Sequence, residues 1–174
     1  MSDMANACKG RLEQFLRREL AVWHGLPEGC VAEDLPSWVK LRSGEGLAHF
    51  GGEIVEYHFR VAEAAGFTEP VRLYFRDGTL CLIRTGLWST DRGVCERLLR
   101  ELGDPPDRLD LVFGMGVVAG GEWVYATRGL MLGVIPDTGL IANVVGYPPC
   151  TLDVYRRRYR DAEPAREFPP SRRP

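Results

Sequence analysis

Residues 120–147 read GGEWVYATRGLMLGVIPDTGLIANVVGY, and they carry the strongest fold signal in the chain. Apolar residues alternate along three short runs of this stretch, which is typical of β-strands. Turn residues separate the runs, at 127–129 (Thr-Arg-Gly) and at 136–139 (Pro-Asp-Thr-Gly). Proline presets φ at the first position of a turn, and glycine tolerates a positive φ. The stretch therefore predicts an antiparallel meander. In parts of it, the side chains on both faces of a strand are apolar, which predicts a sheet covered in part on both faces.

A β-hairpin is predicted at 71–76 and 79–85. Asp77-Gly78 lies between these two alternating runs, and this dipeptide is the usual sequence of a type I′ turn. A further strand is predicted at 53–63, where apolar and polar residues again alternate.

Amphipathic helices are predicted at about 10–24 and about 91–102, from apolar residues that recur at helical spacing. Gly25 is the expected stop of the first helix. Ser89 or Thr90 is the expected N-cap of the second. A short third helix is expected to begin after a Thr151 cap.

The chain divides into two units with the same order of elements, a helix followed by strands that close with a tight turn. The units span 10–88 and 89–160, residues 1–9 are expected to be a flexible N-terminus, and 161–174, with four prolines, a disordered tail. A helix on a short sheet cannot bury its apolar face alone. We therefore predict an α+β fold of two tandem helix-plus-antiparallel-meander units that form one curved sheet with the helices on one face.

Composition removes several classes of function. The 174 residues include 22 Lys and Arg against 24 Asp and Glu, a balance that argues against a dedicated nucleic-acid binder. No apolar run reaches the length of roughly 18 residues that a membrane span needs. The first ten residues lack the basic and apolar regions of a secretory signal, so we expect a cytoplasmic protein. Its five cysteines are widely spaced without a C-x-x-C pair, and they are expected to be free thiols.

Three short motifs follow the second helix: Leu-Gly-Asp-Pro at 102–105, Glu-Trp-Val-Tyr at 122–125 and Asp-Thr-Gly-Leu at 137–140. In this order they resemble the β-lactamase-inhibitor-protein-like unit, which also occurs in small outer-membrane lipoproteins of the barrel-assembly machinery. The resemblance covers about 90–147 well and about 10–85 loosely. It implies a tandem α+β fold whose concave sheet often binds another protein. The sequence departs from the family in lacking a signal peptide, a lipobox and the expected cysteine pair, and no motif fixes binding residues.

Glu56, His58 and Arg60 share one face of the strand predicted at 53–63, with Arg72 and Tyr74 as candidates on a neighbouring strand. Such a group could line a pocket for acid–base chemistry, with His58 as acid or base. The competing interpretation is a ladder of charged side chains that faces solvent. No metal-ligand spacing, phosphate loop or hydrolase motif accompanies these residues. We therefore predict neither a metal nor a cofactor.

Aromatic and arginine side chains are the candidate binding residues, because such side chains dominate protein interfaces. Packing in the core is the competing interpretation for each of them. The candidates are Trp38, Tyr74, Trp88, Trp123, Tyr125 and Arg128.

Two functions remain open from the sequence. The first is a non-enzymatic module that binds a protein or peptide partner on the aromatic and arginine-rich face of its sheet. The alternative is a cofactor-free isomerase or cyclase that acts on a small apolar ligand. A homodimer is compatible with either function, whereas no partnership with nucleic acid or membrane is expected.

Overall fold

A computed structural model describes residues 3–36, 39, 48–49, 54–59, 71–86, 89, 91–113 and 116–160. For residues 48–49, 54–59 and 113 it describes the backbone alone.

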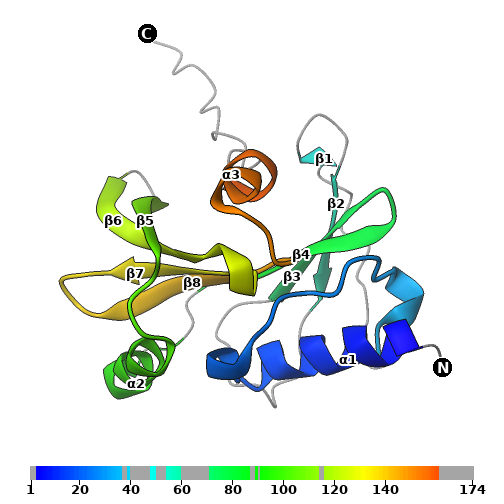
Figure 1. Cartoon of the computed structure of the whole chain (residues 1–174), viewed down its shortest axis with the longest axis horizontal. Coiled ribbons are helices and arrows are strands. Elements are labelled where there is room, and N and C mark those ends of the chain that lie inside the picture. Colours follow the sequence, from blue (N-terminus) through cyan, green and yellow to red (C-terminus); the bar gives the residue numbers. More distant parts are fainter. Residues whose placement is uncertain are drawn as a thin grey trace, which may run out of the picture.

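The described strands form one eight-stranded sheet in the order β1-β2-β3-β4-β8-β7-β6-β5 (Figure 1). Every neighbouring pair is antiparallel. The strands are β1 (Ala48–His49), β2 (Ile54–Phe59), β3 (Val71–Arg76), β4 (Thr79–Thr85), β5 (Asp107–Phe113), β6 (Gly116–Tyr125), β7 (Leu130–Ile135) and β8 (Leu140–Gly146).

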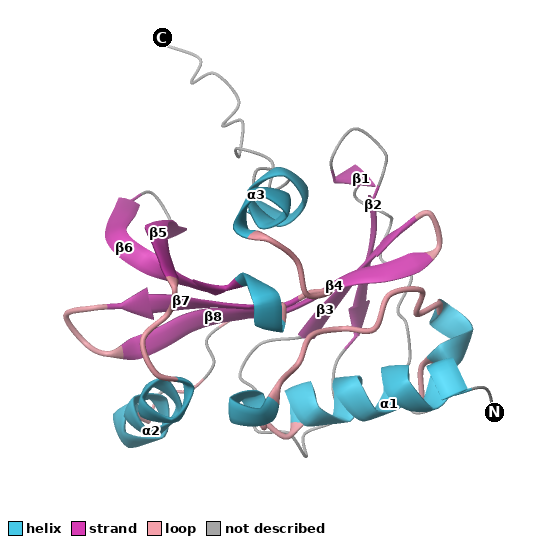
Figure 2. Cartoon of the chain, in the orientation of Figure 1, coloured by secondary structure: helices cyan, strands magenta, loops and turns pink. Residues whose placement is uncertain are grey.

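Helices α1 (Asp3–Leu16) and α2 (Arg92–Leu102) lie on one side of the sheet, as the sequence predicts, whereas α3 (Leu152–Tyr155) lies on the other (Figure 2). Short helical turns complete the fold: η1 (Leu20–Val22), η2 (Ala32–Asp34), η4 (Ala126–Arg128) and the π-helical η5 (Arg156–Arg160). The chain is therefore α+β. Among the described residues, one helix and four strands precede a second helix and four strands, and the two sets of strands meet where β4 pairs with β8. Whether these two halves are a tandem repeat stays a prediction.

Two apolar clusters cover the two faces of the sheet. The larger contains residues of α1 and α2 with the inward side chains of β3, β4, β7 and β8. The smaller packs Tyr155 of α3 against Val124, Met131 and Val145 on the opposite face. Because β7 and β8 contribute to both clusters, almost every residue of these strands is buried. This confirms the expectation of a sheet covered in part on both faces.

The first helix differs from its prediction at both ends. Residues 3–9, expected to be loose, form the beginning of α1, because Ala5 and Cys8 extend the buried stripe of Leu12. The helix ends at Leu16 rather than near residue 24. Arg18 then takes a φ of 63°, and the Glu19 amide donates to the Gln14 carbonyl, the bond of a Schellman stop. An arginine in a position that usually holds glycine hid this end from the sequence.

The predicted turns and the elements from α2 onward follow their predictions closely. Strands β7 and β8 flank the turn at 136–139, and the hairpin of β3 and β4 turns at Asp77-Gly78, both with positive φ. Helix α2 spans nearly the predicted residues, but its N-cap is Asp91. The Asp91 carboxylate accepts from the amides of Gly93 and Val94, a role expected of Ser89 or Thr90. Thr151 caps α3 as predicted.

One expectation about the cysteines is wrong. Cys8 of α1 and Cys30 form a disulfide, with Cα atoms 5.9 Å apart, so only Cys81, Cys95 and Cys150 are free. The fold brings together two residues that are 22 positions apart, in a spacing that no sequence motif marks. No helix in the described part of the chain is long and apolar enough to span a membrane.

Candidate functional site

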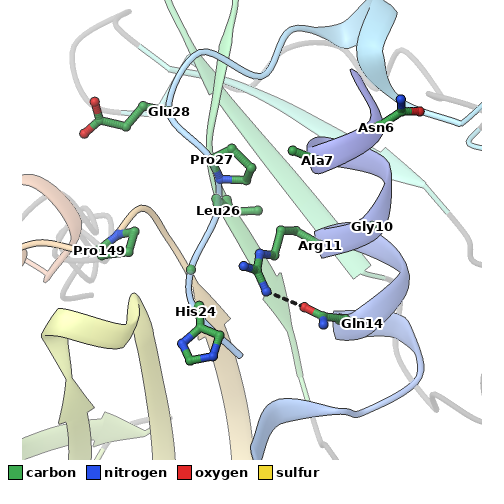
Figure 3. Close-up of a pocket in the computed structure, with 11 residues that line it drawn as sticks. Asn6, Ala7, Gly10, Arg11, Gln14, His24, Leu26, Pro27, Glu28 and Pro149 are labelled. Carbon is green, nitrogen blue, oxygen red and sulfur yellow. Dashed lines mark hydrogen bonds between the residues drawn. The ribbon is translucent and has the colours of Figure 1, made fainter. Parts of the chain in front are cut away.

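An open groove of about 660 Å³ runs between α1 and the segment 24–28, and Pro149 closes one side of it (Figure 3). We call this hollow the α1 groove. One wall is the solvent-facing side of α1 and the other is the chain that leads away from η1. The lining residues are Asn6, Ala7, Gly10, Arg11, Gln14, His24, Gly25, Leu26, Pro27, Glu28 and Pro149.

The wall at 24–28 is fixed to the end of the sheet. The Leu26 amide donates to the Tyr147 carbonyl at 3.1 Å, and the buried Trp23 indole donates to the Gly129 carbonyl at 2.9 Å. Pro27 and Pro149 have fixed φ angles, which further limits movement. The groove therefore has a wall that is formed before any ligand arrives, and this lowers the entropy cost of binding.

Arg11 gives the groove a positive centre. Its side chain extends from α1 toward the segment that carries His24 and Leu26, as Figure 3 shows. Nη1 of Arg11 donates to Oε1 of Gln14 at 2.7 Å, which holds the guanidinium in place. A guanidinium has five N–H donors in a planar fork that fits a carboxylate. Glu28 is exposed at the other end of the lining, so the groove is positive at its centre and negative at that end.

The wall of α1 contains a helix-interior glycine whose replacement gives a direct measure of groove space. A Cβ placed on Gly10 would meet no atom within 4 Å. We expect Gly10→Ala to stabilise the protein by about 0.5–1 kcal/mol, because alanine favours the helix without a clash. Urea unfolding with the disulfide intact measures this change. A destabilised variant would show that the space beside Gly10 is occupied.

Two predicted binding residues pack on the side of the sheet that α1 and α2 cover. Tyr125 is 3% exposed, and its hydroxyl donates to the carbonyl of Gly103 at 2.7 Å. Burial is the main cause that raises the pKa of Tyr125 to about 12. Trp123 is half-buried, and the Arg108 guanidinium lies 4.4 Å from its ring centroid. Both side chains pack in or against the larger apolar cluster.

Arg128, another predicted binding residue, stands behind the groove rather than in it. Its guanidinium donates to main-chain carbonyls in and after η1, those of Leu20, Ala21 and Trp23. Arg128 therefore positions the wall that continues into His24. Tyr74 lies on the α3 side of the sheet and is 8% exposed, and Trp38 and Trp88 lie outside the described residues. The structure does not bring the four described candidates together.

The predicted acid–base group is in part assembled by strand register. Glu56 pairs with Tyr74 and His58 pairs with Arg72, so these four positions share one face of β2 and β3. Arg84 of β4 lies opposite Arg72 on the same face. Arg60 lies outside the described residues, and the side chains of β2 are not described. The α1 groove contains none of these residues.

A buried polar cluster that the sequence did not indicate fastens α3 and η5 to the sheet. Glu122 is 5% exposed, and its carboxylate accepts from the Tyr155 hydroxyl at 2.8 Å and from Nε of Arg160 at 3.2 Å. Nη2 of Arg160 also donates to the Asp110 carbonyl of the edge strand β5 at 3.0 Å. Burial and then the charge of Glu122 raise the pKa of Tyr155. Tyr147 stacks on Tyr159 beside this cluster, with ring centroids 4.9 Å apart.

Sequence reasoning missed the polar residues Arg11, His24 and Glu28 of the groove, because they form no motif. Among the described residues, no three His, Cys, Asp or Glu side chains are grouped closely enough to hold a metal ion. Comparison with family models, curated proteins and solved structures finds no match. The likeness to β-lactamase-inhibitor-protein-like units therefore stays a prediction.

Proposed function

We propose that the protein is a partner-binding module that holds an extended peptide segment of another protein in the α1 groove. The observation that carries this proposal is the Arg11 guanidinium, which lies across an open groove whose facing wall is fixed to the sheet. The volume of about 660 Å³ lies within the range of sites that take small ligands or short peptide segments. The proposal keeps the predicted class of function and moves its surface from the sheet to the groove.

The chemistry of the groove favours a segment with a carboxylate. Arg11 can offer its free N–H donors to such a group while Nη1 remains bonded to Gln14. Next to this charge, Leu26, Pro27 and Pro149 offer apolar contacts for a neighbouring side chain. The occupant that fits is an acidic residue flanked by an apolar one, in an extended chain.

A selection of displayed random peptides against the oxidised protein tests this function. Enriched peptides should contain Asp or Glu, and their binding to soluble protein can be measured by fluorescence anisotropy. Arg11→Gln should weaken that binding at least about tenfold, because a charge-assisted hydrogen bond contributes about 1.5–3 kcal/mol. Gly10→Gln should block the groove, whereas Gly10→Ala is the matched control with nearly the original space.

Two results would count against this function. One is a selection that enriches no acidic peptide. The other is an enriched peptide that binds wild-type protein and both the Gly10→Gln and Arg11→Gln variants equally well, since such a peptide must lie elsewhere. A small apolar ligand in the groove would instead be found by a ligand screen. A second copy of the chain in the groove would be found as a dimer in a size measurement.

A second candidate function is a cofactor-free enzyme with His58 as acid or base. The register that places Glu56, His58, Arg72 and Tyr74 on one face favours it. Incubation of a cell extract with wild-type protein should then convert a metabolite into an isomer, which appears as a new chromatographic peak of unchanged mass. The same change with His58→Ala would exclude this role for His58.

The proposed location is the cytoplasm, where thiols are kept reduced. In that compartment the Cys8–Cys30 disulfide would form after a change to more oxidising conditions.

A further inference from the structure

The Cys8–Cys30 disulfide links the two walls of the α1 groove. Cys8 lies between the lining residues Ala7 and Gly10 of α1, and Cys30 lies two positions after Glu28 of the other wall. Both cysteines are almost completely buried, at 1% and 0% exposure. The bond therefore joins the walls from beneath and leaves the groove open to solvent.

The two walls depend on this bond to different degrees. The segment after the groove is held to the sheet by backbone contacts: the Leu80 amide donates to the Cys30 carbonyl at 2.7 Å, and Val31 bridges to Thr79. This wall would stay in place without the disulfide.

The beginning of α1 lies beside η2 but has less support than this segment. Ahead of Leu12, only Ala5 and Cys8 are buried, and the remaining described residues are exposed or half-buried. A short helix has marginal stability in water unless its apolar face is packed. The first turns of α1, which carry the lining residues Asn6, Ala7 and Gly10, therefore depend on the covalent link through Cys8.

We propose that the Cys8–Cys30 disulfide is a redox switch for the α1 groove: the bonded form holds the groove, and the reduced form releases the first turns of α1. This inference rests on the proposed function for its biological meaning. A dithiol reductant supplies the two electrons. When the first turns of α1 open and expose the buried bond, one thiolate of the reductant attacks a sulfur, the other protein sulfur leaves as a thiolate, and the second reductant thiol resolves the mixed disulfide. The reductant becomes a disulfide, while Cys8 and Cys30 each end as a thiol.

Amide hydrogen exchange tests the switch without any ligand. The amides of residues 7–10 are the informative ones, because the first four amides of a helix have no partner within it. Treatment with dithiothreitol should lower their protection at least about tenfold, while the amides of α2 change little. Cys8→Ala/Cys30→Ala should reproduce the reduced state. Cys81→Ser/Cys150→Ser should behave as oxidised wild-type protein, because it retains the disulfide.

Binding of a labelled acidic peptide from the display selection then separates the two proposals. Reduced protein should bind the peptide at least about tenfold more weakly than oxidised protein, and reoxidation should restore binding. Unchanged protection of residues 7–10 after reduction would overturn the switch, even if peptides bind. Lost protection without any peptide binding in the oxidised form would support the switch and reject the peptide-binding function. If Cys8→Ala/Cys30→Ala fails to fold, the reversible reduction of wild-type protein still decides.

Discussion

Gly129→Ala is expected to destabilise the protein by more than about 4 kcal/mol, or to prevent folding. A Cβ on this residue would lie 1.9 Å from the Tyr147 carbonyl oxygen and 3.0 Å from the Gly25 Cα. These are main-chain atoms, so no side-chain rotation can relieve the clash. Gly129 also has a φ of 59°, which costs an L-residue additional energy.

Gly139→Ala is the matched control for this experiment. Gly139 has a similar φ of 67°, but an added Cβ there would meet nothing within 4 Å. Gly139→Ala should therefore lower the free energy of unfolding by the backbone strain alone, about 1 kcal/mol. Urea unfolding of both variants isolates the contribution of the crowded contact at Gly129. Equal losses in the two variants would mean that the contact with Tyr147 is unimportant.

The crowding at Gly129 has a consequence for the groove. The Gly129 carbonyl accepts from the Trp23 indole and from the Tyr147 amide, both at 2.9 Å. These bonds hold the segment before His24 against the end of β8. Even a small displacement there would move the facing wall of the α1 groove. A folded Gly129 variant should therefore also bind the peptide more weakly.

Arg160→Ala is expected to destabilise the protein by about 2–3 kcal/mol. The loss leaves the buried Glu122 carboxylate with the hydrogen bond from the Tyr155 hydroxyl, and a buried charge that loses one partner is costly. The expected value is below the usual 3–5 kcal/mol for such a loss because the Arg160 side chain is 32% exposed. Chemical unfolding measures the change.

The control for this prediction is Arg157→Ala on the same short helical segment. Within the described part of the chain, the exposed Arg157 side chain bonds only to the main-chain carbonyl of Asp153. Its replacement should change stability by less than about 0.5 kcal/mol. A double-mutant cycle that combines Arg160→Ala with Glu122→Gln should give a coupling energy of about 1–3 kcal/mol. A coupling near zero would show that Arg160 acts through the Asp110 carbonyl instead.

The elements that the sequence predicted well are those whose conformation is set by residues close by in the sequence. The turn at Asp77-Gly78 and the strands around 136–139 follow from turn chemistry and from alternation over a few residues. The α2 helix follows from its apolar stripe and its stop at Gly103. Even where the cap was assigned to Ser89 or Thr90, the error was only one or two positions, because Asp91 is an equally good cap.

The candidate site could not be predicted in this way. Arg11 and His24 are ordinary surface residues in the sequence, and they become facing walls only because α1 stops at Leu16 and the chain returns beside it. The predicted binding residues show the opposite effect. Tyr125 and Arg128 have the composition of a binding surface, but they satisfy main-chain carbonyls at Gly103 and around η1.

The sequence by itself determined the α+β class, the antiparallel pairing and the order of the second half, since local propensity and turn residues act within a few positions. Only the tertiary structure decided the Cys8–Cys30 bond, the Glu122 cluster and the groove. The partners in these features are far apart: Cys8 and Cys30 by 22 residues, Tyr155 and Glu122 by 33, and Trp23 and Gly129 by 106. Such pairs gain their energy only after the chain has packed, so no local pattern records them.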